Sequence, residues 1–262
     1  EPKAQRAEVP RAASAAELLK DYVPKQAVAE SEAFDPSPEN IEKRVRRLEL
    51  NGMKIALLAK KNRGETVFFS MSLPSGDVQS LTGQASVASL TAPMLMRGTS
   101  RFTRAGLRDE FTRLKVAGGV AGQGASFQTT RSNIAAAIRL AAHVVREPSF
   151  PEDEFEQLKK QSITSLESQL AEPAARASEA LGRHFNIYPK GDPRHSLSLQ
   201  ERLEGMGAVT LDQVKAHYRR FYAANRAQFA IVGDFDEEEV IAAIREGFAD
   251  FRFGLGVGRD AE

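Results

Sequence analysis

The chain has no cysteine and only four histidines. Without cysteine it forms no disulfide and offers no thiolate to a metal ion, and the compartment stays open between periplasm and cytoplasm. No apolar run reaches the length and purity of a transmembrane helix, and the N-terminal EPKAQRAEVP lacks the apolar core of a signal peptide. We therefore expect no disulfide scaffold and no membrane span in this chain, and for a fragment or a mature form the missing signal peptide says nothing about secretion.

The chain also lacks an excess of charge of either sign, since its net charge is +1 over 262 residues. Nucleic-acid-binding domains concentrate basic charge on one face, so this balance argues against a dedicated nucleic-acid surface. A hydrophobic content of 42% and a charged content of 27% are ordinary for a soluble globular protein. The length suits one large domain or two modest ones.

Paired metal-binding histidines are absent as well. No two histidines are three or four residues apart, and neither H-E-x-x-H nor H-x-x-E-H occurs. We therefore expect each histidine to lie on the surface or to pack between helices, with His217 held in solvent on a polar helix face. No G-x-S-x-G elbow is present, and there is no cysteine nucleophile. The histidines are His143, His184, His195 and His217.

The glycine-rich stretch GGVAGQG, residues 118–124, resembles a phosphate-binding loop only superficially. Such a loop requires a strand before the glycines and a helix after them, so that the helix N-terminus faces the anion. Here a helical pattern precedes and a strand-like ASFQTT follows. We expect a turn from helix to strand at this place, with no nucleotide site.

The order of predicted elements indicates the fold class. Asn51-Gly52 between two apolar runs predicts a β-hairpin. Strands followed by several helices, with one late strand and a last helix, predict a two-layer α+β domain with a mostly antiparallel sheet covered on one face by helices. The expected strands are 45–50, 53–59, 66–73, 125–130 and 228–232, and the expected helices are 103–116, 133–146, 151–170, 174–185, 211–222 and 236–251.

One long stretch, Val78 to Thr99, carries no charge before Arg97 and is dominated by small and apolar residues. It predicts a buried helix, apolar nearly all round, that ends in Arg-Gly-Thr. A helix of this kind after a strand and a turn resembles the metal-site helix of the insulinase/pitrilysin-type metallopeptidases, which reads roughly HLLEHMLFKGT in active members. Counting back from Thr99 places the H-x-x-E-H positions on Ser89, Ala92 and Pro93, so the resemblance implies this scaffold without its zinc ligands.

Two further segments carry the same resemblance. The run AELLKDY…FDPSPENIE is similar to the connection between the two halves of bacterial members, and TLDQVKAHYRRFYAANRAQFAIVGDFD, residues 210–236, is similar to a second family signature. The implied organisation is an inter-half linker with a short helix over 1–44, a non-catalytic α+β domain over 45–251 and a truncated tail over 252–262. The short helix is expected at residues 12–22.

The resemblance implies a function for the assembly. The chain would be the non-catalytic half-domain of a zinc-dependent peptidase, inactive alone, with no cofactor of its own and with zinc in a catalytic H-x-x-E-H-bearing partner half. It would close a chamber around extended peptides and contribute substrate contacts to their proteolysis. The alternative is a peptide-binding or assembly subunit that has lost peptidase function. We expect no nucleic-acid partner and no membrane span.

Residue-level expectations are few, and no residue is predicted to be catalytic or to bind metal. A captured peptide would pair with an exposed sheet edge, for which Ala125, Ser126, Phe127 and Gln128 are the candidates. The glutamates at 154, 156 and 167 lie on a long predicted helix and are expected to be solvated. The arginines at 97, 101, 104, 108 and 113 are expected to form a solvated face interleaved with acidic residues.

Overall fold

The computed structural model describes residues 31–74 and 76–251, so the helix predicted at 12–22 and the predicted tail at 252–262 lie outside the described residues. The strands are β1 (Arg46–Leu50), β2 (Met53–Ala59), β3 (Thr66–Ser72), β4 (Ala117–Ala121), β5 (Gly124–Thr130) and β6 (Gln228–Gly233). The helices are α2 (Pro38–Arg44), α3 (Val78–Leu81), α4 (Ala85–Met94), the 3-10 turn η1 (Leu95–Arg97), α5 (Arg104–Arg113), α6 (Ile134–Arg146), α7 (Glu152–Ala171), α8 (Pro173–His184), α9 (Leu199–Ala208), α10 (Leu211–Phe221) and α11 (Glu237–Phe248).

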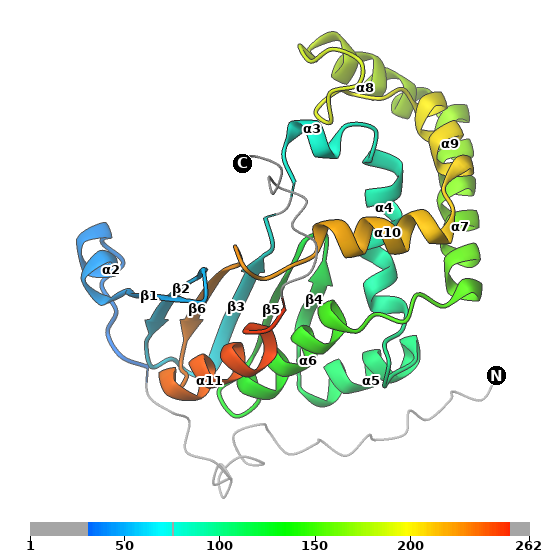
Figure 1. Cartoon of the computed structure of the whole chain (residues 1–262). Coiled ribbons are helices and arrows are strands. Elements are labelled where there is room, and N and C mark those ends of the chain that lie inside the picture. The colour runs from blue at the N-terminus through cyan, green and yellow to red at the C-terminus, as the bar shows by residue number, and fades with distance from the viewer. Residues whose placement is uncertain (1–30, 75, 252–262) are drawn as a thin grey trace, which may run out of the picture.

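The described strands form one six-stranded sheet in the order β1-β2-β6-β3-β5-β4. Only β2 and β6 pair in parallel, and the other neighbours are antiparallel. Helices α6 and α11 lie against one face of this sheet, while α4, α7, α8, α9 and α10 extend beyond one end of it (Figure 1). The predicted fold class, a mostly antiparallel sheet covered on one face by helices, is confirmed.

Strand β3 shows why only one face is covered. Val67, Phe69 and Met71 are buried, whereas Phe68 and Ser70, which alternate with them, are exposed. Successive side chains of a strand point to opposite faces, so period-two alternation puts the apolar set under the helices and leaves the other set open. The rings of Phe69 and Phe127 stack at 4.7 Å between centroids, in the middle of the core.

The hairpin between β1 and β2 forms where the sequence predicts it. Asn51 and Gly52 both have positive φ, 52° and 83°, as the two-residue hairpin turn with the right twist requires. A Cβ on Gly52 would lie 2.5 Å from the carbonyl oxygen of Asn225, so glycine is also required by the close approach of that backbone. The turn and this contact fix the register of β1 on β2.

The segment before β1 is packed against the sheet. Arg44, at the end of α2, forms an ion pair with Glu32 and donates from Nη2 to the carbonyl oxygen of Ala59 at 2.8 Å. The ring of Phe34 lies beneath the Lys60 ammonium, 4.5 Å from its centroid. The described part of the predicted linker therefore contacts the domain, and the domain boundary at residue 44 stays a prediction. Among the described residues, no helix combines the length and apolarity that a bilayer crossing needs.

The prediction of one buried helix from Val78 to Thr99 is wrong. Helix α3 ends after one turn, where Gly83 adopts a φ of +73°, and α4 begins two residues later. Within α4 only Leu90, Thr91 and Met94 are buried. The sequence misled because alanine and serine are uncharged but small, so they bury little apolar area and are tolerated at the surface.

Candidate functional site

The three positions that correspond to zinc ligands lie on α4. Ser89 and Pro93 are exposed and Ala92 is half-buried, so these positions face outward from the core. The hydroxyl of Ser89 donates to the carbonyl oxygen of Ser86 at 2.7 Å, a bond within its own helix. Neither Ala92 nor Pro93 has a side-chain atom that could bind a metal ion.

The carboxylates of the neighbouring helix α7 do not form a metal site with these positions. Within 31–74 and 76–251, no group of three or more histidine, cysteine, aspartate or glutamate side chains is placed to hold a metal ion. Ser89 instead lies in a groove of about 430 Å³ between α4, α7 and α9. Serine and glutamine side chains dominate its polar wall, and hydroxyls and amides are poor substitutes for the imidazoles and carboxylates that bind zinc.

Arg97 corrects two expectations about solvated charges. Its side chain is 9% exposed, and Nη1 lies 2.7 Å from Oε2 of Glu154. Nη2 donates to Oε1 of Gln161 at 3.3 Å, and Arg104 approaches the same Glu154 oxygen at 3.4 Å. Arg97 is therefore a buried anchor between η1 and α7, not part of a solvated face, and Glu154 is its partner. Helical spacing missed this because the contact joins residues far apart in sequence.

The Gly-Thr that follows Arg97 is structural too. Gly98 has a φ of +154°, and a Cβ there would lie 2.9 Å from Oγ of Ser149, so only glycine fits. Thr99 is buried, and its hydroxyl accepts from the amide of Phe102 at 3.1 Å and lies 3.0 Å from Nε2 of His143. The Arg-Gly-Thr segment thus holds the chain after α4 in place, so it has a structural role that needs no metal ligands.

His217 lies inside the protein, so the expectation that it is held in solvent is wrong. The side chain is 3% exposed and packs against Phe221, with ring centroids 4.6 Å apart. Its Nδ1 lies 3.4 Å from Oε1 of Gln84, just before α4. Burial, and to a smaller extent the Arg220 guanidinium, lower the pKa of His217 to about 4. The ring faces inward because α10 packs against α4, a contact that the α10 sequence alone does not reveal.

This burial predicts an acid sensitivity. The folded-state pKa of about 4 lies below the unfolded value of about 6.5, so unfolding is coupled to proton uptake between these pH values. The stability that neutral His217 supports is present above pH 6.5 and is lost as the pH falls towards 4, by roughly 2–3 kcal/mol. Between pH 7 and pH 4.5, the free energy of unfolding measured in urea should fall less for His217→Gln than for the parent chain. His184→Gln, at an exposed histidine, should lose as much stability between the two pH values as the parent does. Equal losses in all three proteins would contradict the lowered pKa of His217.

The remaining histidines are not arranged for catalysis. His195 places Nδ1 2.8 Å from the carbonyl oxygen of Tyr188 and so closes its own loop. His184 is exposed at the end of α8, with its ring against Phe185. Each of these two rings therefore contacts residues of its own segment of the chain.

The four residues predicted to contact substrate lie on β5, which is not a sheet edge. This strand pairs with β3 on one side and with β4 on the other, so its backbone has no free side for an added peptide. Ala125 and Phe127 point into the core, whereas Ser126 is exposed and Gln128 is half-buried on the open face. Backbone pairing at β5 is therefore excluded, and contact of a peptide with Ser126 or Gln128 stays a prediction.

The two strands that do form the edges differ in character. Strand β1 is charged, with Arg46, Arg47 and Glu49 exposed. Strand β4 reads Ala-Gly-Gly-Val-Ala and has neither charge nor proline. Charges and prolines normally protect a sheet edge from pairing, so β4 is the unprotected edge. It borders a hollow of about 650 Å³ that is also lined by Met96 of η1, just after α4. Its lack of charge was the sequence signal that could have identified it.

Sequence and structure comparisons agree on the kind of domain. The family described as "Peptidase M16 inactive domain" matches residues 208–256. No curated protein matches the chain. Together with the fold, the match confirms the predicted resemblance to the non-catalytic domain of insulinase-type (M16) peptidases.

Solved structures share the fold at low sequence identity. The chain is 22% identical to a peptidase M16 inactive domain from Pseudomonas fluorescens, with a TM-score of 0.67, covering 83% of this chain and 53% of that one. A protease from Helicobacter pylori matches at 14% identity and a TM-score of 0.65, over 90% and 54%. The periplasmic protease PqqL from Escherichia coli matches at 16% and 0.64, over 90% of this chain and 26% of its own. The chain thus spans about half, or about a quarter, of the structures it matches.

Proposed function

We propose that the chain is a non-catalytic domain of a two-half zinc peptidase of the insulinase type, and that it closes the chamber in which a partner half cleaves peptides. The observation that carries this proposal is α4, which lies where the resemblance places the metal-site helix of active members. Its Arg-Gly-Thr anchor is intact, with Arg97 2.7 Å from Glu154, while Ser89, Ala92 and Pro93 provide no zinc ligand. A helix that has its anchor but no zinc ligands fits a domain that contributes surface and contacts to the assembly and no catalytic group.

In this proposal the chemistry belongs to the partner half. Zinc bound there would polarise the peptide carbonyl and activate water for attack. None of Ser89, Ala92 and Pro93 on α4 carries a carboxylate or an imidazole that could act as a general base, and the neighbouring His217 is buried. The contributions of this chain are the chamber wall and the positioning of the peptide. Positioning alone has a large effect on rate, because it removes the entropy of bringing the reactants together.

We assign backbone pairing of a peptide to β4, with Ser126 and Gln128 of the adjacent β5 as the predicted side-chain contacts. Strand addition needs a free row of backbone amides and carbonyls, and β4 is the uncharged edge of the described sheet. A Cβ added to Gly119 would meet no atom within 4 Å, so the strand is not crowded there by the domain's own side chains. The hollow beside β4 and Met96 leaves room for alternate side chains of an extended peptide.

The first measurement is zinc content and peptidase activity of the chain with and without its partner half. After incubation in excess zinc and desalting, the chain alone should carry less than ~0.1 zinc per molecule, because no described site has the required ligands. It should not cleave an unfolded, quenched-fluorescence peptide. Adding the H-x-x-E-H-bearing half should restore cleavage that a chelator abolishes, above the activity of that half alone.

The outcomes separate this proposal from its rival. One zinc per chain, or chelator-sensitive cleavage by the chain alone, would contradict the non-catalytic assignment. A chain that binds the partner half without raising its activity would be the peptide-binding or assembly subunit described above as the alternative. A control with the partner half's H-x-x-E-H glutamate replaced by glutamine should bind the chain and remain inactive.

A further inference from the structure

The groove between α4, α7 and α9 carries charge of one sign only. Its volume, about 430 Å³, lies in the range of about 300–1,000 Å³ that small-ligand pockets occupy. No aspartate or glutamate lines it, and its one charged group is the guanidinium of Arg202. Within the described residues this guanidinium has no partner, and the neighbouring Glu201 pairs with Lys190 at 2.6 Å instead. The groove therefore offers an uncompensated positive charge.

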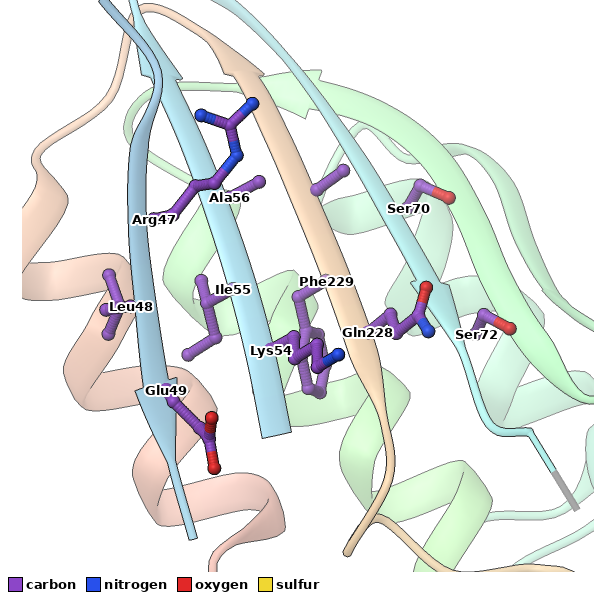
Figure 2. Close-up of a pocket in the computed structure, with 11 residues that line it drawn as sticks. Arg47, Leu48, Glu49, Lys54, Ile55, Ala56, Ser70, Ser72, Gln228 and Phe229 are labelled. Carbon is purple, nitrogen blue, oxygen red and sulfur yellow. The ribbon is translucent and has the colours of Figure 1, made fainter. Parts of the chain in front are cut away.

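The hollow on the open face of the sheet, shown in Figure 2, is a contrasting case. It is larger, about 710 Å³, and is lined by the cations Arg47 and Lys54. Glu49 also lines it and lies opposite Lys54 across the β1–β2 pair. An anion in that hollow would meet a carboxylate beside the cations, and like charges repel. The groove between the helices contains no such competitor.

Helical spacing places the polar side chains of the groove on one wall of each helix. Residues three or four apart lie on the same face of a helix. The groove residues with this spacing are Ser86 and Ser89 on α4, Gln161, Ser165 and Gln169 on α7, and Arg202 and Met206 on α9. Gly205 lets α9 approach α4, because a Cβ there would lie 2.4 Å from Oγ of Ser86. This approach brings the guanidinium-bearing face of α9 to the groove.

Several hydrogen-bond donors in the groove have no acceptor within the described protein. Arg97 donates to Oε1 of Gln161 at 3.3 Å, which leaves the Nε2 protons of this amide available. Nε2 of Gln169 donates to Oγ of Ser165 at 3.3 Å, so the Ser165 hydroxyl keeps its own proton for another acceptor. A side chain bonds to the Ser86 carbonyl but none to its hydroxyl, which is therefore free. Unpaired donors around a single positive charge favour an anion as the ligand.

The groove also has an apolar part, which narrows the class of anion. Leu166 and Met206 line it and are buried, and Leu197 lies beside them. One guanidinium balances one negative charge, and its planar fork matches a carboxylate. The ligand expected from these groups is a carboxylate that is attached to an apolar side chain.

The remaining polar groups distinguish a peptide end from a free amino acid. The ammonium of a free amino acid would find no carboxylate in the groove, whereas the same nitrogen in a peptide is a neutral amide. Ser89 and Ser162 donate their protons to carbonyls of their own helices, at 2.7 and 2.9 Å. Their oxygens remain acceptors, as the N–H groups of a peptide require.

From these observations we propose that the groove binds the C-terminal residue of a peptide, with its carboxylate on Arg202 and an apolar last side chain against Leu166 and Met206. The inference deepens the proposed function and rests on it for the source of the peptide, which is a substrate end or a cleavage product. Binding itself requires only this chain, so it can be measured without the zinc-bearing half.

Fluorescence anisotropy of the full chain with two labelled peptides tests the proposal. Both are hexapeptides that carry fluorescein on the N-terminus and leucine at the C-terminus, one as the free acid and one as the amide. The free acid should bind at least ten-fold more tightly than the amide, because only the acid has the charge that pairs with the guanidinium. Inorganic phosphate and free leucine at equal concentration should not displace it.

Variants of the groove identify the group that holds the carboxylate. Arg202→Gln should weaken binding of the free acid at least ten-fold and remove its advantage over the amide. Arg202→Lys should recover part of the affinity, since it keeps the charge and loses the fork. Arg176→Gln, at an exposed arginine of α8 outside the groove, is the matched control and should bind as the parent does. Circular dichroism melts confirm that each variant is folded, as expected for exposed positions.

The outcomes separate this inference from the proposed function. Equal affinity for the acid and the amide, or unchanged binding by Arg202→Gln, would overturn the inference and leave the pairing with a zinc-bearing half untouched. Displacement of the peptide by phosphate or by free leucine would assign the groove to another ligand and would also overturn it. A chain that binds the free acid through Arg202 but does not raise the activity of the zinc-bearing half would support the site and contradict the proposed function.

Discussion

Replacing Arg97 with alanine should lower the free energy of unfolding by about 3 kcal/mol, because it leaves Glu154 partly buried without its main partner. For a domain of this size the midpoint of thermal unfolding should fall by about 6–12 °C. Arg97→Lys should recover part of the loss, since an ammonium can keep the contact to Glu154 but cannot also donate to Gln161. Differential scanning calorimetry and urea unfolding measure both effects.

The matched control is Arg108→Ala on α5. The Arg108 side chain is 78% exposed and its nearest carboxylate, on Asp109, is 3.7 Å away. Exposed pairs of this kind contribute less than about 1 kcal/mol, so the control should unfold almost as the parent does. Equal losses for Arg97→Ala and Arg108→Ala would show that Arg97 does not anchor η1 to α7.

Replacing Phe69 with alanine should have a larger effect, a loss of about 3–5 kcal/mol. The ring is 1% exposed, stacks on Phe127 and lies 6.1 Å from the ring of Phe229 between centroids. Its removal would leave a cavity between three strands that a hydrogen-bonded sheet cannot close. Equilibrium unfolding in urea should show the loss as a lower midpoint with an unchanged slope.

The adjacent residue provides the control within the same strand. Phe68 is 56% exposed on the open face, so Phe68→Ala should cost less than about 1 kcal/mol in the isolated chain. Comparable destabilisation by Phe68→Ala and Phe69→Ala would contradict the assignment of a covered and an open sheet face.

The fold class followed from the sequence because its local signals were unambiguous. Asn51-Gly52 has few alternatives to a hairpin turn, and the order of strands and helices along the chain indicates a two-layer α+β domain. The Arg-Gly-Thr at the end of α4 allowed the zinc positions to be counted. In each case the residues that decide the structure are neighbours in sequence.

The contacts that the sequence did not reveal join distant segments. Arg97 meets Glu154 across 57 residues, and His217 meets Gln84 across 133, so neither burial is visible in a helical pattern. Strand β5 was predicted to be an edge because residues 118–124 were interpreted as a turn, whereas Ala117–Ala121 form β4 and pair with β5. Pattern analysis finds periodicity within an element, whereas these features depend on tertiary packing.

The difference between the two edges of the described sheet sets how isolated copies of the chain can associate. Pairing of two molecules through β1 would bring Arg46, Arg47 and Glu49 of both together, and the desolvation of these charges opposes it. Of the two edges only β4 is open to pairing, and two antiparallel β4 strands would join two sheets about a two-fold axis. Such a contact uses the same surface on both molecules and is complete at two. Isolated copies of the chain would therefore stop at a closed pair and would not extend into fibres.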